Sequence, residues 1–176
     1  QGVIGAAFDE AHGGFAGDAR TIAVVMAELG AALAVEPYLA TAVIAGRLLQ
    51  QADQSGAVTS LIEGIVAGEQ ICVLANSGFG DPFAGAQLTA AKTAAGWQIN
   101  GELPAVRHAE LAHRLLVPVK VGDSLEVHCL ARDHAGIGCE AQRTIDGGGA
   151  ASLKFNAVLL SDATRLPIGG SVAAAL

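Results

Sequence analysis

The chain has 176 residues, of which 52% are hydrophobic and 15% charged, and its formal net charge is −7. This apolar content is ample for a buried core and excludes a wholly disordered chain, while the absence of any basic run makes nucleic acid an unexpected partner. No apolar stretch approaches the length of a membrane span, and no basic segment precedes an apolar one at the start, so neither membrane insertion nor secretion is predicted.

The first seventy residues are predicted to be helical, after a glycine-rich lead-in over residues 1–17. Asp18 is a suitable N-cap for a helix over residues 19–34, because its carboxylate can accept from the free N–H groups of the first turn. Glu36-Pro37 then separates this helix from a second one over residues 37–51, since the residue before a proline avoids the α region. Both helices are so apolar that we expect them to be buried against other helices.

A third, shorter helix is predicted after the loop that follows residue 51. Residues 60–63 read Ser-Leu-Ile-Glu, a capping box, and Gly68 marks the end of the helix.

From residue 71 the apolar pattern changes from helical spacing to short runs bounded by turn residues. A hairpin is indicated at Gly122-Asp123, and a glycine-rich turn over residues 146–149 precedes the last strand. The predicted strands cover residues 71–75, 86–91, 97–100, 113–121, 124–132 and 151–160. Closely spaced strands without intervening helices predict an α+β fold, in which an N-terminal helical segment is followed by an antiparallel β-barrel or sandwich. The tail from Pro167 has no evident packing partner.

No residue pattern by itself identifies a catalytic or metal-binding group. Gly78 and Gly80 follow a strand, but the dinucleotide motif fails because position 83 is Phe and a strand, not a helix, comes next. Among His128, Cys129, His134 and Cys139, the first two are adjacent on a strand and point to opposite faces, so we expect no metal site and interpret them as a solvent-facing histidine and a core cysteine.

The three cysteines are an odd number without close pairing, which indicates reduced thiols and a cytoplasmic location. Cys72 lies within the apolar run ICVLA, which would raise its pKa and disfavours it as a nucleophile.

The order of the parts is informative. The segments FDEAHGGFAGD, MAELGAALAVEPYLATAVIAGRLL, IVAGEQICVLA and GWQINGELPAVRHAELAHRLLVPV follow one another, and together they resemble the acyl-CoA dehydrogenase family over nearly the whole chain. The resemblance is greatest to the bacterial branch whose second helix begins EPYL.

The resemblance implies a division into three regions. Residues 1–70 would be part of the family's N-terminal helical domain, residues 71–162 the middle β-barrel domain, and residues 163–176 a linker towards a C-terminal helical domain. That C-terminal domain carries the family's catalytic glutamate and lies outside this sequence, so no catalytic residue is assigned. Because the chain begins with Gln1 in the middle of continuing structure, we expect a piece of a longer protein.

The resemblance also implies a site for FAD, which in the family lies between the middle and C-terminal domains. The predicted cofactor-binding residues are Val73, Leu74, Gly80, Ala105, Val106 and Arg107. Where the family has a threonine that meets the flavin ring, this chain has Leu74, and where the family has a serine it has Gly80. The family's stacking tryptophan is Ala105 here, and the threonine after it is Arg107. These losses predict a weakened flavin site, since a hydroxyl donor and an aromatic ring are both gone.

Three functions remain open from the sequence. The first is a fragment of an FAD-dependent acyl-CoA dehydrogenase, which would act on an acyl-CoA, form an oligomer and pass electrons to electron-transfer flavoprotein as the family does. The second is a non-catalytic partner subunit with a degenerate flavin site in a heteromeric acyl-CoA dehydrogenase. The third, an interaction or storage domain without cofactor, is supported only by the lack of catalytic residues.

Overall fold

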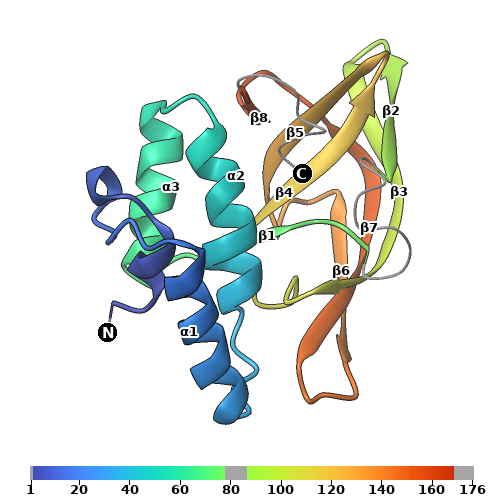
Figure 1. Ribbon diagram of the computed structural model, residues 1–176. Helices are drawn as coiled ribbons and strands as arrows, with labels where there is room; N and C mark the ends of the chain where they lie inside the picture. The colour runs from blue at the N-terminus through green and yellow to red at the C-terminus, as the bar shows by residue number, and fades with distance from the viewer. Residues whose placement is uncertain (1, 78–86, 169–176) are drawn as a thin grey trace.

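The structure is a computed structural model that describes residues 2–77 and 87–168. A layer of helices lies against one side of an eight-stranded sheet (Figure 1). The helices, in chain order, are η1 (Ile4–Ala7), η2 (Glu10–His12), α1 (Ala19–Ala31), η3 (Leu39–Ala45), α2 (Gly46–Gln51) and α3 (Gly56–Val66). The strands are β1 (Cys72–Leu74), β2 (Leu88–Thr93), β3 (Gly96–Arg107), β4 (Arg114–Val121), β5 (Ser124–Ala131), β6 (Ile137–Arg143), β7 (Gly149–Leu159) and β8 (Arg165–Leu166).

The predicted succession of helices and a largely antiparallel β domain is confirmed. Along the sheet the order is β6-β7-β3-β2-β4-β5-β8, and the sheet is open rather than closed into a barrel. Two pairings are parallel, and both involve β4: β1 and β2 each run parallel to it. β1 pairs with the first half of β4 and β2 with its second half, so the chain leaves this strand after Leu74 and returns to it at Leu88.

The predicted start and break of the first two helices are confirmed. The Asp18 side chain accepts a hydrogen bond from the Thr21 N–H at 2.9 Å, and α1 ends at Ala31, before the Glu36-Pro37 pair. The second helical stretch begins with a π-helical segment, η3, and continues directly into α2. The capping box was wrong for α3, which begins at Gly56 with Ser55 in the N-cap position. Val58 is 4% exposed, and burying it favours a helix that starts a turn earlier.

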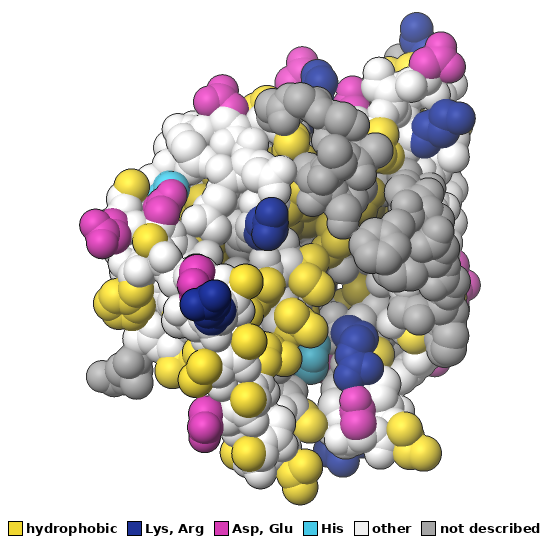
Figure 2. Space-filling view, viewed as in Figure 1, with side chains coloured by type: hydrophobic (Ala, Val, Ile, Leu, Met, Phe, Trp, Pro, Cys, Tyr) yellow, Lys and Arg dark blue, Asp and Glu magenta, His cyan; other side chains and the backbone are white. Residues whose placement is uncertain are grey.

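The expectation that both long apolar helices are buried holds only for the second. α1 has no buried residue, whereas η3 and α2 bury Thr41, Ala42, Ala45, Gly46, Leu48 and Leu49. Figure 2 shows hydrophobic side chains gathered over α1 and along the hollow between the helices and the sheet. Val24 of α1 is 62% exposed, and Leu33, two residues after its end, is 87% exposed, so this stretch presents a large part of its apolar surface to solvent.

The core consists of two clusters on opposite faces of β1. One, the sheet cluster, lies within the curled sheet and contains Val73, Val106 and Phe155. The other, the helical cluster, lies between the helices and the sheet. It contains Phe8, Leu49 and Ile62 together with Leu116 and Val127 of the strands.

The strand expectations were incomplete in two places. β6 had no predicted counterpart, and β3 extends through Arg107 where only residues 97–100 were predicted. The first two residues of the expected free tail do have packing partners: the Asp53 N–H donates to the Pro167 carbonyl at 2.7 Å, and Ile168 forms a β-bridge with Ala52. Just before them β8 pairs with β5. Residues 169–176 lie outside the described part of the chain. Within the described residues no helix is long and apolar enough to cross a membrane.

Candidate functional site

Two predicted cofactor-binding residues, Val73 and Leu74, lie on β1 at the boundary between the two clusters. Successive side chains on a strand point to opposite faces. Val73 is therefore buried in the sheet cluster, whereas Leu74 packs against the helical cluster. Backbone groups here are already engaged: the Ala75 N–H donates to the Leu116 carbonyl and the Asn76 N–H to the Leu74 carbonyl. Gly80 lies outside the described residues.

The other three, Ala105, Val106 and Arg107, form the end of β3. Val106 is fully buried in the same cluster as Val73 and is paired with Ala151 of β7. The register between β3 and β7 shifts between Leu103 and Val106, which leaves Ala105 without a partner residue in β7. Ala105 also has a φ of +51°, a left-handed conformation that a residue with a side chain seldom adopts. The backbone thus bulges at the position predicted to face a flavin.

Arg107 forms an ion pair that the sequence did not reveal. Its Nη2 lies 2.6 Å from Oδ2 of Asp146, in the turn between β6 and β7. The other carboxylate oxygen of Asp146 accepts from the Thr144 hydroxyl and, at 3.1 Å, from the Gly148 N–H. The hydrogen bond from Thr144 is the largest of several contributions that lower the pKa of Asp146, the others including Gly148 and the charge of Arg107. The carboxylate is therefore held in its ionised form opposite Arg107.

His108, next to Arg107, begins the turn that leads from β3 to β4. Its N–H donates to the Gly149 carbonyl at 3.0 Å, and its φ is +57°, so it is a second left-handed residue within four positions. The side chain is 8% exposed, and burial lowers its pKa although Glu110 acts in the opposite direction. A neutral imidazole is expected there at neutral pH. Non-glycine residues in this conformation are often found at functional sites, where surrounding structure holds them.

The structure corrects the interpretation of His128. This residue is 2% exposed rather than solvent-facing, because its imidazole is enclosed between Thr164, just before β8, and Glu126. Its Nδ1 lies 2.9 Å from the Thr164 hydroxyl and its Nε2 lies 3.1 Å from Glu126. Across the described residues, no three His, Cys, Asp or Glu side chains gather as metal ligands would.

Sequence reasoning missed Asp146 and Thr144 as neighbours of the predicted site. The Asp-Gly-Gly-Gly turn was visible in the sequence, but nothing in it indicated that β7 would lie beside β3. Pairing of β3 with β7 brings this turn to the end of β3, 39 residues away from Arg107 along the chain.

No protein-family model matches the chain, and no curated protein sequence matches it. Solved structures do match. The ChsE4-ChsE5 complex from Mycobacterium tuberculosis has a TM-score of 0.81 and 24% identity, covering 96% of this chain and 45% of that one. The Tcur3481-Tcur3483 steroid ACAD variant has a TM-score of 0.79 and 25% identity, and the match covers 98% of this chain and 46% of that one. An acyl-CoA dehydrogenase complexed with FAD from Bacillus anthracis has a TM-score of 0.77 and 21% identity, and the match covers 94% of this chain and 31% of that one.

The fold is that of the acyl-CoA dehydrogenases, and the resemblance predicted from the sequence is confirmed. The chain spans between 31% and 46% of the length of the three structures just described.

Proposed function

We propose that this chain is part of an FAD-dependent acyl-CoA dehydrogenase, an enzyme that oxidises the Cα–Cβ bond of an acyl-CoA thioester. The supporting observation is that the helical layer and the sheet together match an acyl-CoA dehydrogenase complexed with FAD over 94% of this chain. The proposal includes the division into an N-terminal helical part (1–70), a middle β domain (71–162) and a linker (163–176). It also includes a cytoplasmic oligomer with acyl-CoA as substrate and electron-transfer flavoprotein as electron acceptor.

The residues at the end of β3 fit FAD through their backbone more than through their side chains. The bulge leaves Ala105 without a partner residue in β7, so its N–H is a candidate donor to the edge of a flavin ring. Leu74 and Ala105 have no side-chain donor, and Arg107 is engaged with Asp146. We therefore propose a flavin site that depends on backbone contacts and on the buried wall formed by Val73 and Val106.

Three apolar side chains of this chain have a role in this proposal. FAD, when bound, accepts the hydride from Cβ of the acyl group. Val73 and Val106 would exclude water from one side of the cofactor, and Leu74, between the sheet and η3, would separate it from the helical cluster. No residue of this chain is assigned to remove the α proton.

The test is a visible absorption spectrum of the purified 176-residue chain during titration with FAD. Retained or titratable flavin bands, with a stoichiometry near one per chain, are the expected result. Failure to bind FAD both in this chain and in the protein of which it is part would contradict the proposal.

A second candidate function is supported by the Arg107–Asp146 ion pair. Arg107 stands where the family resemblance predicts a threonine that contacts the flavin, and its guanidinium is paired with Asp146 instead. A subunit that binds no flavin of its own would tolerate this replacement. Two of the similar structures each carry the names of two proteins: the ChsE4-ChsE5 complex and Tcur3481-Tcur3483. In this alternative the chain belongs to a non-catalytic partner subunit of a heteromeric acyl-CoA dehydrogenase.

The two functions are distinguished by counting flavins in the native assembly. Native mass spectrometry together with the absorbance of released FAD gives the number of cofactors per polypeptide. One flavin per copy of this chain supports the first function. Fewer than one, with a second unlike polypeptide present, supports the partner role.

A further inference from the structure

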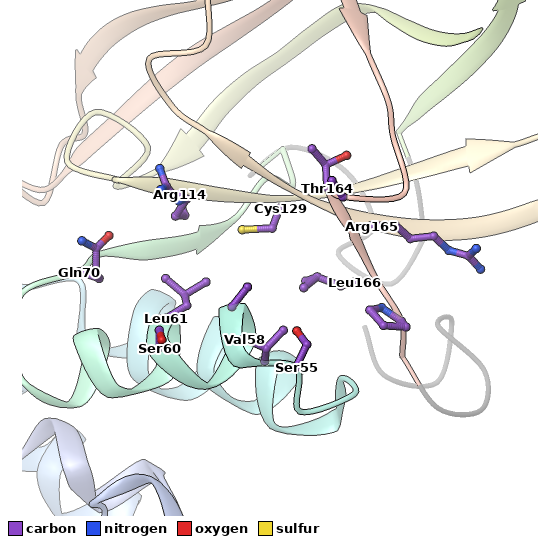
Figure 3. A pocket seen from close by; sticks show the side chains of 13 residues that line it. Ser55, Val58, Ser60, Leu61, Gln70, Arg114, Cys129, Thr164, Arg165 and Leu166 are labelled. Carbon is purple, nitrogen blue, oxygen red and sulfur yellow. The ribbon is translucent and has the colours of Figure 1, made fainter.

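A groove of about 410 Å³ lies between α3 and the edge of the sheet formed by β5 and β8. Its volume falls within the range of small-molecule sites in proteins. Of the predicted cofactor-binding residues that the structure describes, none lines it. Figure 3 shows Arg114 and Gln70 towards one end of the groove and Arg165 and Ser55 towards the other, with apolar side chains between them.

The charge of the groove is opposite to that of the chain as a whole. Among the described residues, its lining includes two arginines and no carboxylate, in a chain whose net charge is −7. Arg165 lies 3.7 Å from Glu126 and is partly neutralised by it. Arg114 donates only a long hydrogen bond, 3.4 Å, to the His113 carbonyl, and no carboxylate of the described residues forms an ion pair with it. The guanidinium of Arg114 is therefore available to an anion.

The space between the arginines is apolar at its base and has hydroxyl groups at its edge. Val58 and Leu166 are 4% and 6% exposed, and Leu61 packs beside them. Ser60 of α3 and Ser55, the N-cap residue before it, line the groove, and the Ser55 hydroxyl makes no capping bond to the helix. The Sγ of Cys129 extends from β5 towards Leu61 (Figure 3).

We propose that this groove binds a small amphiphilic anion, a carboxylate or phosphate that carries a short aliphatic body. The anionic head would pair with Arg114, and the body would cover Val58, Leu61 and Leu166. A neutral ligand of the same shape would leave the arginine unpaired, and a cation would be repelled by both arginines. The proposal does not depend on flavin binding, because the groove shares no residue with the predicted flavin positions that the structure describes.

Calorimetric titration of the 176-residue chain with hexanoate and hexyl phosphate tests the proposal, with 1-hexanol and hexylammonium as matched neutral and cationic probes. We expect both anions to bind at least about tenfold more tightly than hexanol, from the added charge-assisted hydrogen bond, and hexylammonium not to bind. A preference for hexyl phosphate or for hexanoate then identifies the head group. The Arg114→Gln variant should lose about tenfold or more in affinity for the anions.

Arg143→Gln is the matched control, because it removes the same charge from an exposed position on β6 outside the groove. The affinity of this variant should equal that of the unmodified chain. Cys129 provides a readout that needs no variant: hexyl phosphate should slow its alkylation by iodoacetamide and leave Cys139, which does not line the groove, unaffected. Equal binding of hexanol, an equal loss in Arg143→Gln, or unprotected Cys129 would each overturn the proposal.

Discussion

Arg107 at the end of β3 donates to Asp146 in the β6–β7 turn across 2.6 Å, although the two residues are 39 positions apart in the chain. Both side chains are about half exposed, so the pair contributes little to stability. Its importance is positional: Arg107 lies at a position that the family resemblance predicts to contact the flavin, and its guanidinium is directed at the turn instead. The pair is therefore the first place to alter in a test of cofactor binding.

Replacing Arg107 by threonine should strengthen FAD binding. The new hydroxyl can supply one hydrogen bond to the flavin, which corresponds to about tenfold in affinity. Quenching of flavin fluorescence during titration measures the change. Arg143→Thr is the control for charge alone, and equal affinities in both variants would show that this position does not contact FAD.

The close approach of Phe8 to Gly46 predicts opposite effects for two glycine substitutions. A Cβ at Gly46 would lie 2.5 Å from Cζ of Phe8, whose side chain is fully buried, so Gly46→Ala should destabilise by about 1–3 kcal/mol. Gly30 lies in α1, and a Cβ added there would meet nothing within 4 Å, so Gly30→Ala should stabilise by about 0.5–1 kcal/mol. Urea unfolding measures both, and a neutral Gly46→Ala would mean that Phe8 can move aside.

Stability should decrease as the pH falls below 6.5. Burial lowers the pKa values of His108 and His128 from the ordinary 6.5, so in the window just below that value the unfolded chain binds protons that the folded chain does not. Proton uptake then favours unfolding. The carboxyl groups with lowered pKa values, Asp18 and Asp146, act in the same direction but only below 3.8.

The measurement is the urea midpoint of unfolding between pH 7.5 and 5. His128→Gln should show a shallower dependence on pH than the unmodified chain, since one of the two groups is gone. His134→Gln, at an exposed position, controls for the substitution itself. An unaltered slope in His128→Gln would contradict the assignment.

The three cysteines should differ in reactivity in the order of their burial. Burial raises the pKa of Cys72 far above 9.0 and also raises the pKa values of Cys129 and Cys139. Cys72 is fully buried, so we expect alkylation of native protein to modify Cys139 first and Cys72 only after unfolding. Peptide mass spectrometry over a time course resolves the three, and early labelling of Cys72 would contradict the order.

Features encoded by neighbouring residues could be predicted from the sequence, as the Asp18 cap and the break at Glu36-Pro37 show. β6 could not, because an exposed edge strand has no apolar alternation to reveal it: most of its residues are exposed. The end of β3 was missed because Gly101 and Pro104 are typical of a turn. In the structure two register shifts accommodate them within the strand.

The candidate site was predictable only in part. The β1 and β3 positions followed from the family resemblance, whereas the neighbour of Arg107 depends on the pairing of β3 with β7. The groove beside α3 depends on β8, two residues long and without a pattern of its own. Both arise from long-range contacts, on which local sequence carries no information.

The helical cluster contains Leu116, Val127 and Leu166, so the helices complete their core only with side chains from the second half of the chain. During synthesis on the ribosome, α2 and α3 would emerge long before these residues. Until then their apolar faces would be exposed to solvent. Contacts of such separation also slow folding. A chain interrupted before β5 would therefore aggregate rather than persist as a small helical protein, and the boundary at residue 70 would not mark a unit that can be expressed separately.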